Sequence, residues 1–186
     1  MNATRRPVPI RRRLRRREFP GHVRFLTFSC YRRLPLFGHS RIRDAFVEQL
    51  SLTKLRLGFE LYAWVVMPEH VHLLLLPSPP DMTVTRILRG LKRPFAEHVL
   101  NRWRELDAPV LGRIVDARGN EHFWQRGGGY DRNIVSEDEY FEKCLYIHHN
   151  PVKRGLVESA VQWKWSSARW YELKDDSTLA CDPPPI

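Results

Sequence analysis

Two histidines one residue apart, His70 and His72, are the residues of this chain best suited to chemistry. They stand in the stretch MPEHVHLLLL, where an apolar run favours a strand. Alternate side chains of a strand point to the same face, and a rise of about 3.3 Å per residue puts their Cα atoms ~7 Å apart. Both imidazoles could therefore bind one metal ion. The alternative for the pair alone is two buried histidines bonded to backbone groups.

A second segment, YIHHNPVKRGLV, follows about 70 residues later and brings a possible nucleophile. Ser136 and Glu139 have the spacing of a capping box, which marks the start of a helix. Pro151 disfavours helical geometry at the preceding residue, so we expect the helix to end at Asn150. Tyr146 and Asn150 are four residues apart and share one face of this helix. A phenol and an amide beside two strand histidines would make a site with two or three metal ligands and a nucleophile.

Other residues compete for these roles. Tyr130 follows three consecutive glycines and precedes Asp131, so it is a rival nucleophile, although a ring packed on a sheet is the favoured interpretation. His148 and His149 could assist proton transfer or touch DNA, but we expect surface histidines at a helix end. Four tryptophans could stack on unpaired bases, yet core packing is favoured for them. These are Trp124, Trp163, Trp165 and Trp170.

In the order and spacing of these segments, the chain resembles the single-tyrosine HUH transposases, specifically the REP-associated tyrosine transposases of bacteria. The resemblance runs from about residue 21 to residue 171. Besides the histidine pair and the tyrosine segment, it takes in residues 63–76, 123–125 and 163–168.

The resemblance implies a role for each candidate residue. Tyr146 would be the nucleophile, and His70 and His72 would be metal ligands. Asn150 would take the position of the third ligand, where related insertion-sequence transposases often carry glutamine. The implied cofactor is a divalent metal, Mg²⁺ or Mn²⁺. The implied substrate is single-stranded DNA with hairpins of a repeated palindromic element, bound by a monomer or a homodimer.

The chemistry of DNA cleavage suits this set of groups. A divalent cation can neutralise the non-bridging oxygens and stabilise the leaving 3′-oxygen, and a tyrosine hydroxyl needs such help to attack at neutral pH. The expected product is a 5′-phosphotyrosine with a free 3′-hydroxyl, so joining is possible as well as cutting. Two alternatives remain: a catalytically idle DNA-binding protein on the same fold, and a metal hydrolase that activates water and would survive Tyr146→Phe.

The elements that must position these residues follow from hydrophobic periodicity. Strands and helices in the order βαββαβ, with a further hairpin strand and helix, predict an α+β sandwich with helices on an antiparallel sheet. The resemblance sharpens this to a ferredoxin-like fold, with the histidine pair on a central strand and the tyrosine helix nearby. Expected strands are residues 23–30, 59–67 and 70–76, and a hairpin joins 123–126 to 130–133; expected helices are 40–55, 83–103 with a kink or break at Pro94, and 136–150.

Positive charge is concentrated at the start of the chain. The formal net charge is +10, and eight arginines with no acid stand in the first 17 residues, which leaves only +2 for the rest. We expect a disordered arm over residues 1–20 that binds phosphates, with a solubilising leader or a misplaced start codon as alternatives. Predicted DNA contacts are Arg11, Arg12, Arg13, Arg15, Arg16 and Arg17 of this arm, and Lys92 and Arg93 of the second helix.

Length and composition bound the remaining possibilities. A chain of 186 residues can bury one core, so residues 21–172 should form one catalytic domain and 173–186 a loose tail. Cys30, Cys144 and Cys181 are odd in number and widely spaced, which predicts neither disulfides nor a zinc site and fits a reducing cytoplasm. No apolar run approaches transmembrane length and no signal core precedes the domain, so we expect a soluble cytoplasmic protein without a membrane partner.

Overall fold

The computed structural model describes residues 19, 21–78, 81–127, 129–175 and 177–185. The predicted arginine arm, with Arg11, Arg12, Arg13, Arg15, Arg16 and Arg17, lies outside the described residues. The strands are β1 (Arg24–Ser29), β2 (Glu60–Val66), β3 (His70–Leu76) and β4 (Tyr130–Asn133). The helices are α1 (Ser40–Leu57), α2 (Val84–Glu105), α3 (Leu111–Ile114), α4 (Glu137–Lys153) and α5 (Ala168–Leu173), with short 3-10 turns η1 (Tyr31–Arg33) and η2 (Ala160–Gln162).

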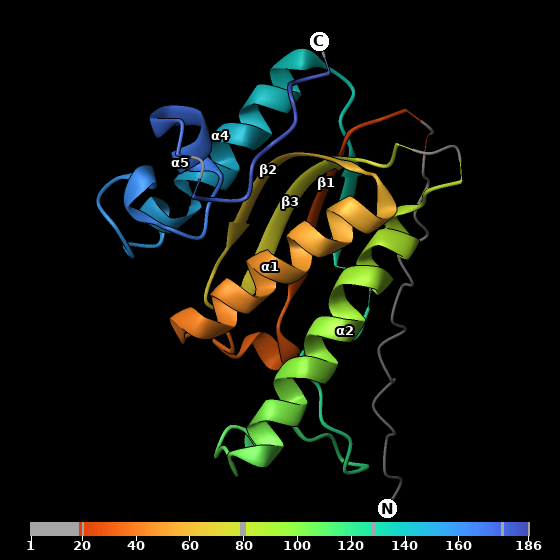
Figure 1. The fold of residues 1–186 in the computed structure, drawn as a ribbon, viewed down its shortest axis with the longest axis vertical. Coiled ribbons are helices and arrows are strands. Elements are labelled where there is room, and N and C mark those ends of the chain that lie inside the picture. Colours follow the sequence, from red (N-terminus) through yellow and green to blue (C-terminus); the bar gives the residue numbers. More distant parts are fainter. Residues whose placement is uncertain (1–18, 20, 79–80, 128, 176, 186) are drawn as a thin grey trace, which may run out of the picture.

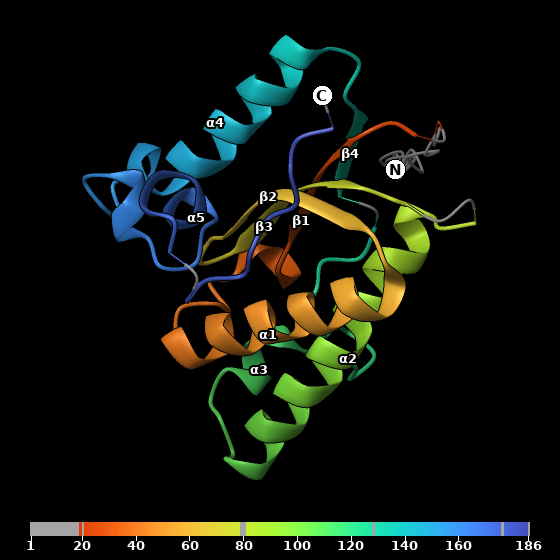
Figure 2. The ribbon, with the colours of Figure 1, turned by 45° about the horizontal axis from the view of Figure 1, so that its top comes forward.

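One four-stranded sheet organises these elements in the order β2-β3-β1-β4, and all neighbouring strands are antiparallel. This is the strand order of a ferredoxin-like sheet, so the predicted fold class is confirmed. Helices α1 and α2 cover one face of the sheet (Figure 1). Helix α4 lies on the opposite face, as the turned view shows (Figure 2). The strand β3, which carries both histidines, is therefore central and covered on both sides.

The side chains of β3 alternate between two hydrophobic cores, as its sequence predicts. Val71, Leu73 and Leu75 belong to the larger core, which α1 and α2 complete. Leu74 belongs to the smaller core, which contains residues of α4. The histidines share the face of Leu74 because residues two apart in a strand point the same way. The face that carries the candidate chemistry is thus the face covered by α4.

Helix α4 begins where the sequence predicts and ends later. The Ser136 hydroxyl accepts a hydrogen bond from the Glu139 N–H at 3.2 Å, which confirms the cap. The predicted end at Asn150 is wrong, because the helix runs through Pro151 to Lys153. A proline in the last turn removes one backbone donor, and burial of both residues 150 and 151 compensates for that loss.

Helix α2 likewise continues through its internal proline. The helix extends unbroken from Val84 to Glu105 with Pro94 inside it, so of the expected kink or break the break is wrong, and the kink stays a prediction. Leu91 and Phe95 on either side of the proline are buried in the larger core. Packing of this apolar stripe outweighs the hydrogen bond that the proline cannot donate.

The glycine segment does not form the predicted hairpin. The strand β4 pairs with β1, and Trp124 pairs with Cys30 just beyond the end of β1, so both segments follow the same partner instead of each other. Gly129 lies between them with φ +69°, and a Cβ there would overlap the carbonyl oxygen of Thr27. Only glycine combines this backbone conformation with so close an approach to β1.

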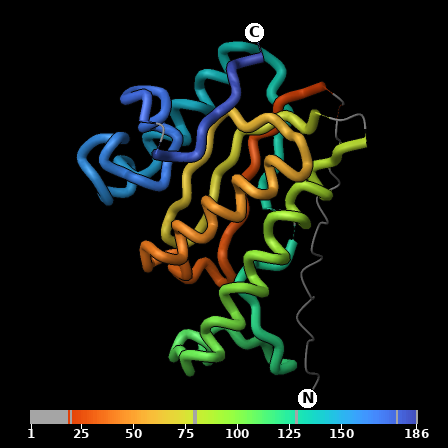
Figure 3. Tube along the Cα trace, in the orientation of Figure 1, coloured from red at the N-terminus to blue at the C-terminus, as the bar shows by residue number. Residues whose placement is uncertain are grey.

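The segment after α5 packs along the outer edge of β2 instead of forming the loose tail that we expected (Figure 3). Asp182 donates its N–H to the Leu61 carbonyl at 2.8 Å and accepts the Leu61 N–H on its carboxylate at 2.6 Å. Lys54 of α1 forms an ion pair with the same carboxylate at 3.0 Å. The edge strand is thereby covered.

Two further sequence expectations concern the chain as a whole. Cys30, Cys144 and Cys181 are buried and none of the three forms a disulfide. None of the helices in the described part of the chain combines the length and apolar composition needed to cross a lipid bilayer.

Candidate active site

The two histidines face each other across a short gap. The Nε2 atoms of His70 and His72 are 3.0 Å apart, and the two residues are 9% and 4% exposed. The outer nitrogens are each held by an oxygen: His72 Nδ1 lies 2.7 Å from Thr27 Oγ1, and His70 Nδ1 lies 3.0 Å from Glu69 Oε1. With an N–H at each Nδ1, both lone pairs at Nε2 would point into the gap.

Asn150 completes this group from helix α4. It is buried, and its Nδ2 atom lies 3.2 Å from Nε2 of His72. A half-turn of the amide about its last bond would present Oδ1 at the same point without moving the backbone. The structure therefore brings together the three predicted ligands, from two elements that are far apart in the sequence.

The donor set fits a divalent cation. The two Nε2 atoms are 3.0 Å apart, close enough for both imidazoles to hold the same ion. Among the described residues, no three or more His, Cys, Asp or Glu side chains gather around one point, so a third protein ligand would have to be of another type, and the amide of Asn150 lies beside the pair. Two imidazoles and an amide also leave positions open for a substrate.

Burial keeps both imidazoles neutral, the form that binds metal. Burial lowers the pKa of His72 to about 3. Burial also lowers the pKa of His70, against the opposing charge and hydrogen bond of Glu69. Glu69 forms an ion pair with Arg154 at 3.0 Å, so the C-terminal end of α4 is tied to the histidine pair.

Tyr146 stands at the mouth of the site. It is 38% exposed, and its ring centroid lies 5.3 Å from that of His72. Phe25 contacts both rings, stacked on His72 at 5.5 Å and edge-on to Tyr146 at 5.9 Å. These residues line a cavity of about 310 Å³ together with Thr27, Tyr130 and Lys143. The phenol and His72 thus line one hollow, and His70 reaches it through the Nε2 atom that faces His72.

Two lysines near Tyr146 were not identified from the sequence. Thr27 and Glu69, whose oxygens contact the histidines, were also not identified. Lys143 lines the cavity, and Lys153 Nζ lies 5.4 Å from the ring centroid of Tyr146. Lys143, Tyr146, Asn150 and Lys153 follow one another along α4 at intervals of 3, 4 and 3 residues, so all four lie near one helical face. This spacing could have identified the two lysines. Thr27 gives no such signal, because only the register of β1 against β3 places it opposite His72.

The rival nucleophile, Tyr130, lies in the same cavity. It is 50% exposed on the edge strand β4, and its ring lies 6.0 Å from Phe25. Of the two tyrosines that line this cavity, only Tyr146 has a ring contact with His72 among the described residues. The geometry therefore favours Tyr146.

The two helix-end histidines differ. His148 is buried, and its Nε2 lies 2.9 Å from the Ser167 hydroxyl, so the expectation of a surface residue is wrong. Burial lowers its pKa to about 4. His149 is exposed, as expected. The error for His148 arises because two contacts are not evident from the sequence: η2 packs against α4, and Tyr171 of α5 contacts the His148 ring.

The predicted DNA contacts on α2 lie away from the histidine pair. Lys92 Nζ lies 5.3 Å from the Trp124 ring centroid, and Arg93 forms an exposed ion pair with Glu97 at 2.7 Å. Because α2 covers the other face of the sheet, the structure does not bring these residues to the site (Figure 2). Their contact with DNA stays a prediction. Trp124 and Trp163 are buried, which confirms core packing for both.

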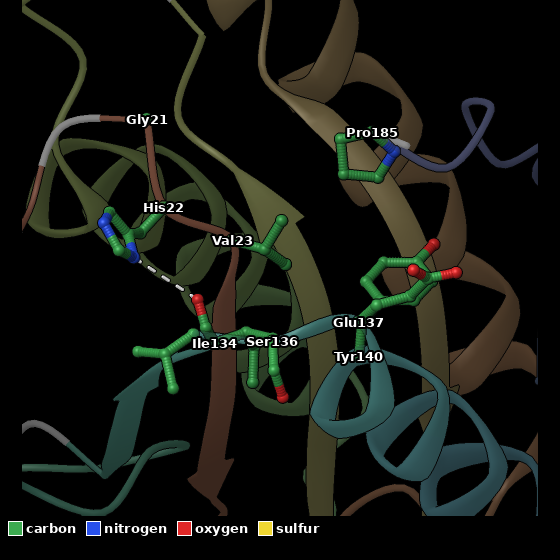
Figure 4. Close-up of a pocket in the computed structure, with 9 residues that line it drawn as sticks. Gly21, His22, Val23, Ile134, Ser136, Glu137, Tyr140 and Pro185 are labelled. Carbon is green, nitrogen blue, oxygen red and sulfur yellow. Dashed lines mark hydrogen bonds between the residues drawn. The ribbon is translucent and has the colours of Figure 1, made fainter.

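A separate hollow of about 300 Å³ lies where α4 begins (Figure 4). Gly21, Tyr140 and Pro185 are among its lining residues. His22 Nδ1 lies 3.3 Å from the Ile134 carbonyl oxygen at its rim. None of the predicted catalytic or metal-binding residues lines it.

Comparison with known proteins gives the family and the fold. Residues 21–150 match the protein family described as "Transposase IS200 like". The REP-associated tyrosine transposase of Escherichia coli (strain K12) is 31% identical over 110 residues, which cover 59% of this chain and 54% of that protein. The solved structure of a REP-associated tyrosine transposase bound to a REP hairpin aligns with a TM-score of 0.66 at 24% identity, over 90% of each chain, and so shares the fold. Because the family match extends over most of its length, the chain belongs to the IS200-like transposase family.

Proposed function

We propose that this protein is a metal-dependent single-stranded DNA endonuclease and strand transferase that acts at hairpins of repeated palindromic elements. The observation that carries the proposal is the cavity that Tyr146 shares with His72, whose Nε2 atom lies within 3.2 Å of both His70 and Asn150. The fold is shared with a REP-associated tyrosine transposase bound to a REP hairpin, which supports the choice of substrate.

The reaction that suits these groups is a phosphoryl transfer to a phenol. The Tyr146 oxygen attacks the phosphorus, the bond from phosphorus to the 3′-oxygen breaks, and a 5′-phosphotyrosine forms. The phenol loses a proton and the leaving 3′-oxygen gains one. Attack by a 3′-hydroxyl on the phosphotyrosine reverses the step and joins two strands, because one phosphate ester replaces another.

The surrounding side chains have distinct tasks. His70 and His72 through Nε2, and Asn150 through Oδ1, would hold Mg²⁺ or Mn²⁺, which when bound supplies charge neutralisation at the phosphate oxygens. Lys143 and Lys153 place positive charge beside Tyr146, where an incoming phosphate needs it.

The setting that we propose is the cytoplasm, with the protein acting as a monomer or a homodimer. Three buried, unpaired thiols are compatible with a reducing compartment. Size-exclusion chromatography with light scattering, with and without a hairpin oligonucleotide, would give the oligomeric state.

The test uses single-stranded oligonucleotides that span hairpins found beside the gene. Each is incubated with Mg²⁺ or Mn²⁺ and the wild type, Tyr146→Phe or Tyr130→Phe, and the products are separated on a denaturing gel. We expect a covalent band with the wild type and Tyr130→Phe that is lost in Tyr146→Phe. Cleavage without an adduct would indicate a hydrolase, and binding without either would indicate a catalytically idle DNA-binding protein.

A further inference from the structure

A second hollow opens beside the active-site cavity and carries a concentration of arginines. Its volume is about 390 Å³, and two of its walls, Thr27 and Tyr130, are also walls of the active-site cavity. The other side chains that matter here are Arg32, Arg33, Gln125 and Arg126. We call this hollow the arginine cleft.

The two neighbouring arginines of the cleft are held in an uncommon conformation. Arg32 and Arg33 follow β1 with φ +52° and +56°, in the left-handed region that side chains other than glycine rarely adopt. Gln125 fixes this turn, because its Oε1 accepts the Arg32 N–H at 2.9 Å. Backbone strain of this kind persists where the surrounding structure imposes it, and it is concentrated at functional sites.

The charge of the cleft is largely uncompensated. Arg32 and Arg33 are exposed, and within the described residues no carboxylate forms an ion pair with either of them. Arg126 reaches Asp116 only at 3.5 Å, and its side chain is 60% exposed. Three guanidinium groups around one hollow favour a phosphate, which takes paired N–H donors from each.

The remaining walls favour a nucleotide over an acidic peptide. Tyr130 is half exposed and offers a ring face on which a base can stack. Gln125 uses its oxygen on the protein backbone, so its amide N–H₂ group is a donor suited to the edge of a base. An acidic peptide would use the arginines but would have no need of an aromatic ring beside them.

We propose that the arginine cleft binds the nucleotide that flanks the scissile phosphate in the single strand. Arg32 and Arg33 hold its phosphate, and Tyr130 and Gln125 contact its base. This inference rests on the proposed function, because a phosphate placed at Tyr146 puts the next nucleotide against the wall that the two hollows share. The arrangement gives Tyr130 a role in binding instead of a role as nucleophile.

The cleft also continues toward the basic face of α2. Gly127 lines both the arginine cleft and a shallow groove of α2 that contains Lys92, Arg93 and Trp124. A strand that leaves the cleft over the glycine segment would therefore reach the two residues that the sequence suggested for contacts with the DNA backbone. Shared walls thus connect the active-site cavity, the cleft and this groove.

The test measures binding of a hairpin alone and of the same hairpin with a single-stranded flank on either side, by fluorescence anisotropy in EDTA so that no cleavage occurs. The variant carries Arg32→Gly with Arg33→Gly, because glycine keeps the positive φ without strain. The control carries Arg102→Ala with Arg113→Ala, which removes from α2 and α3 two exposed arginines that do not line the cleft. Circular dichroism establishes that each variant folds, and Arg126→Gln gives a second variant outside the strained turn.

We expect the wild type to bind one of the flanked hairpins at least about tenfold more tightly than the hairpin alone. The Arg32→Gly, Arg33→Gly variant should lose this increment and keep its affinity for the hairpin within a few-fold. Its salt slope on the flanked hairpin should decrease by about 0.7, the value for one neutralised phosphate on a single strand. Arg126→Gln should lose part of the increment, and the control should keep it.

Three results would overturn the inference. The first is an affinity increment that survives in the Arg32→Gly, Arg33→Gly variant, and the second is a wild type that binds flanked and unflanked hairpins equally. Either result would show that the cleft does not bind the nucleotide and would leave the cleavage proposal intact. Inorganic phosphate that displaces the flank as well as a dinucleotide does would indicate a simple anion site. A wild type that binds no hairpin in any form would instead contradict the proposed function itself.

Discussion

Replacing Thr27 by valine should weaken the histidine pair without disturbing the sheet. Valine keeps the shape and β-branching of threonine, so the pairing of β1 with β3 should persist. What is lost is the hydroxyl, which lies 2.7 Å from Nδ1 of His72. His72 is only 4% exposed, so bulk water does not readily replace that partner.

The magnitude of the effect follows from this burial. A buried polar nitrogen left without a partner costs about 1–3 kcal/mol, so the free energy of unfolding in EDTA should fall by that amount in Thr27→Val. Removing the group that orients a metal-binding histidine typically lowers metal affinity about 10–100-fold. Thr27→Ser, which keeps the hydroxyl, should stay close to the wild type in both measurements.

Two assays separate these effects. Urea denaturation in EDTA measures the free energy of unfolding, and isothermal titration with Mn²⁺ measures affinity; the titration needs no DNA and no turnover. If Thr27→Val bound Mn²⁺ as tightly as Thr27→Ser did, the hydroxyl would not orient His72, and the assignment of His72 as a ligand would lose its support. Equal stability of the two variants would show that Nδ1 finds another partner.

Three further outcomes are expected. Glu69→Ala should lower Mn²⁺ affinity about tenfold or more, because His70 loses the carboxylate at 3.0 Å from its Nδ1; unchanged affinity in the same titration would contradict this. Gly129→Ala should lower the free energy of unfolding, measured by urea denaturation, by roughly 1–3 kcal/mol more than Gly58→Ala does. The two glycines have φ of +69° and +67°, but only Gly129 would place a Cβ against Thr27. Equal losses would mean that β4 moves freely. His148 should contribute roughly 2–3 kcal/mol to a loss of stability in EDTA as the pH falls from about 6.5 to 4, because burial lowers its pKa to about 4 and the unfolded chain then binds the extra proton. Burial lowers the pKa of His72 to about 3, so that residue adds to the loss over the same range. His148→Gln should reduce the loss by the share of His148, and an unchanged pH dependence would assign all of it to other groups.

Local patterns predicted those parts of the site that depend on one element at a time. The alternation of β3 placed His70 and His72 on one face, and the four-residue spacing in α4 placed Tyr146 beside Asn150. Both patterns depend only on helix and strand periodicity, which the sequence displays directly. The resemblance then supplied the assembly of the two elements, which periodicity alone does not provide.

Features that depend on pairing between distant segments were missed. Thr27 lies 45 residues from His72, and only the register of two strands brings their side chains together. The glycine segment was mistaken for a hairpin because two short strand-like runs flank it, whereas both runs pair with β1. Pro151 predicts a helix end that the structure does not have, because burial of the last turn of α4 outweighs the lost hydrogen bond and cannot be seen in the local sequence.

The contact between Asp182 and Leu61 has a practical consequence for handling the protein. Both backbone groups of Leu61, on the outermost strand of the sheet, are used by a residue near the C-terminal end of the chain. Shortening the chain before Asp182 would leave the catalytic groups in place but would expose an unpaired strand edge, onto which a second molecule could add a strand. An affinity tag should therefore be added after the segment that contains Asp182 and should not replace it. Aggregation of a truncated form would not indicate that the active site is damaged.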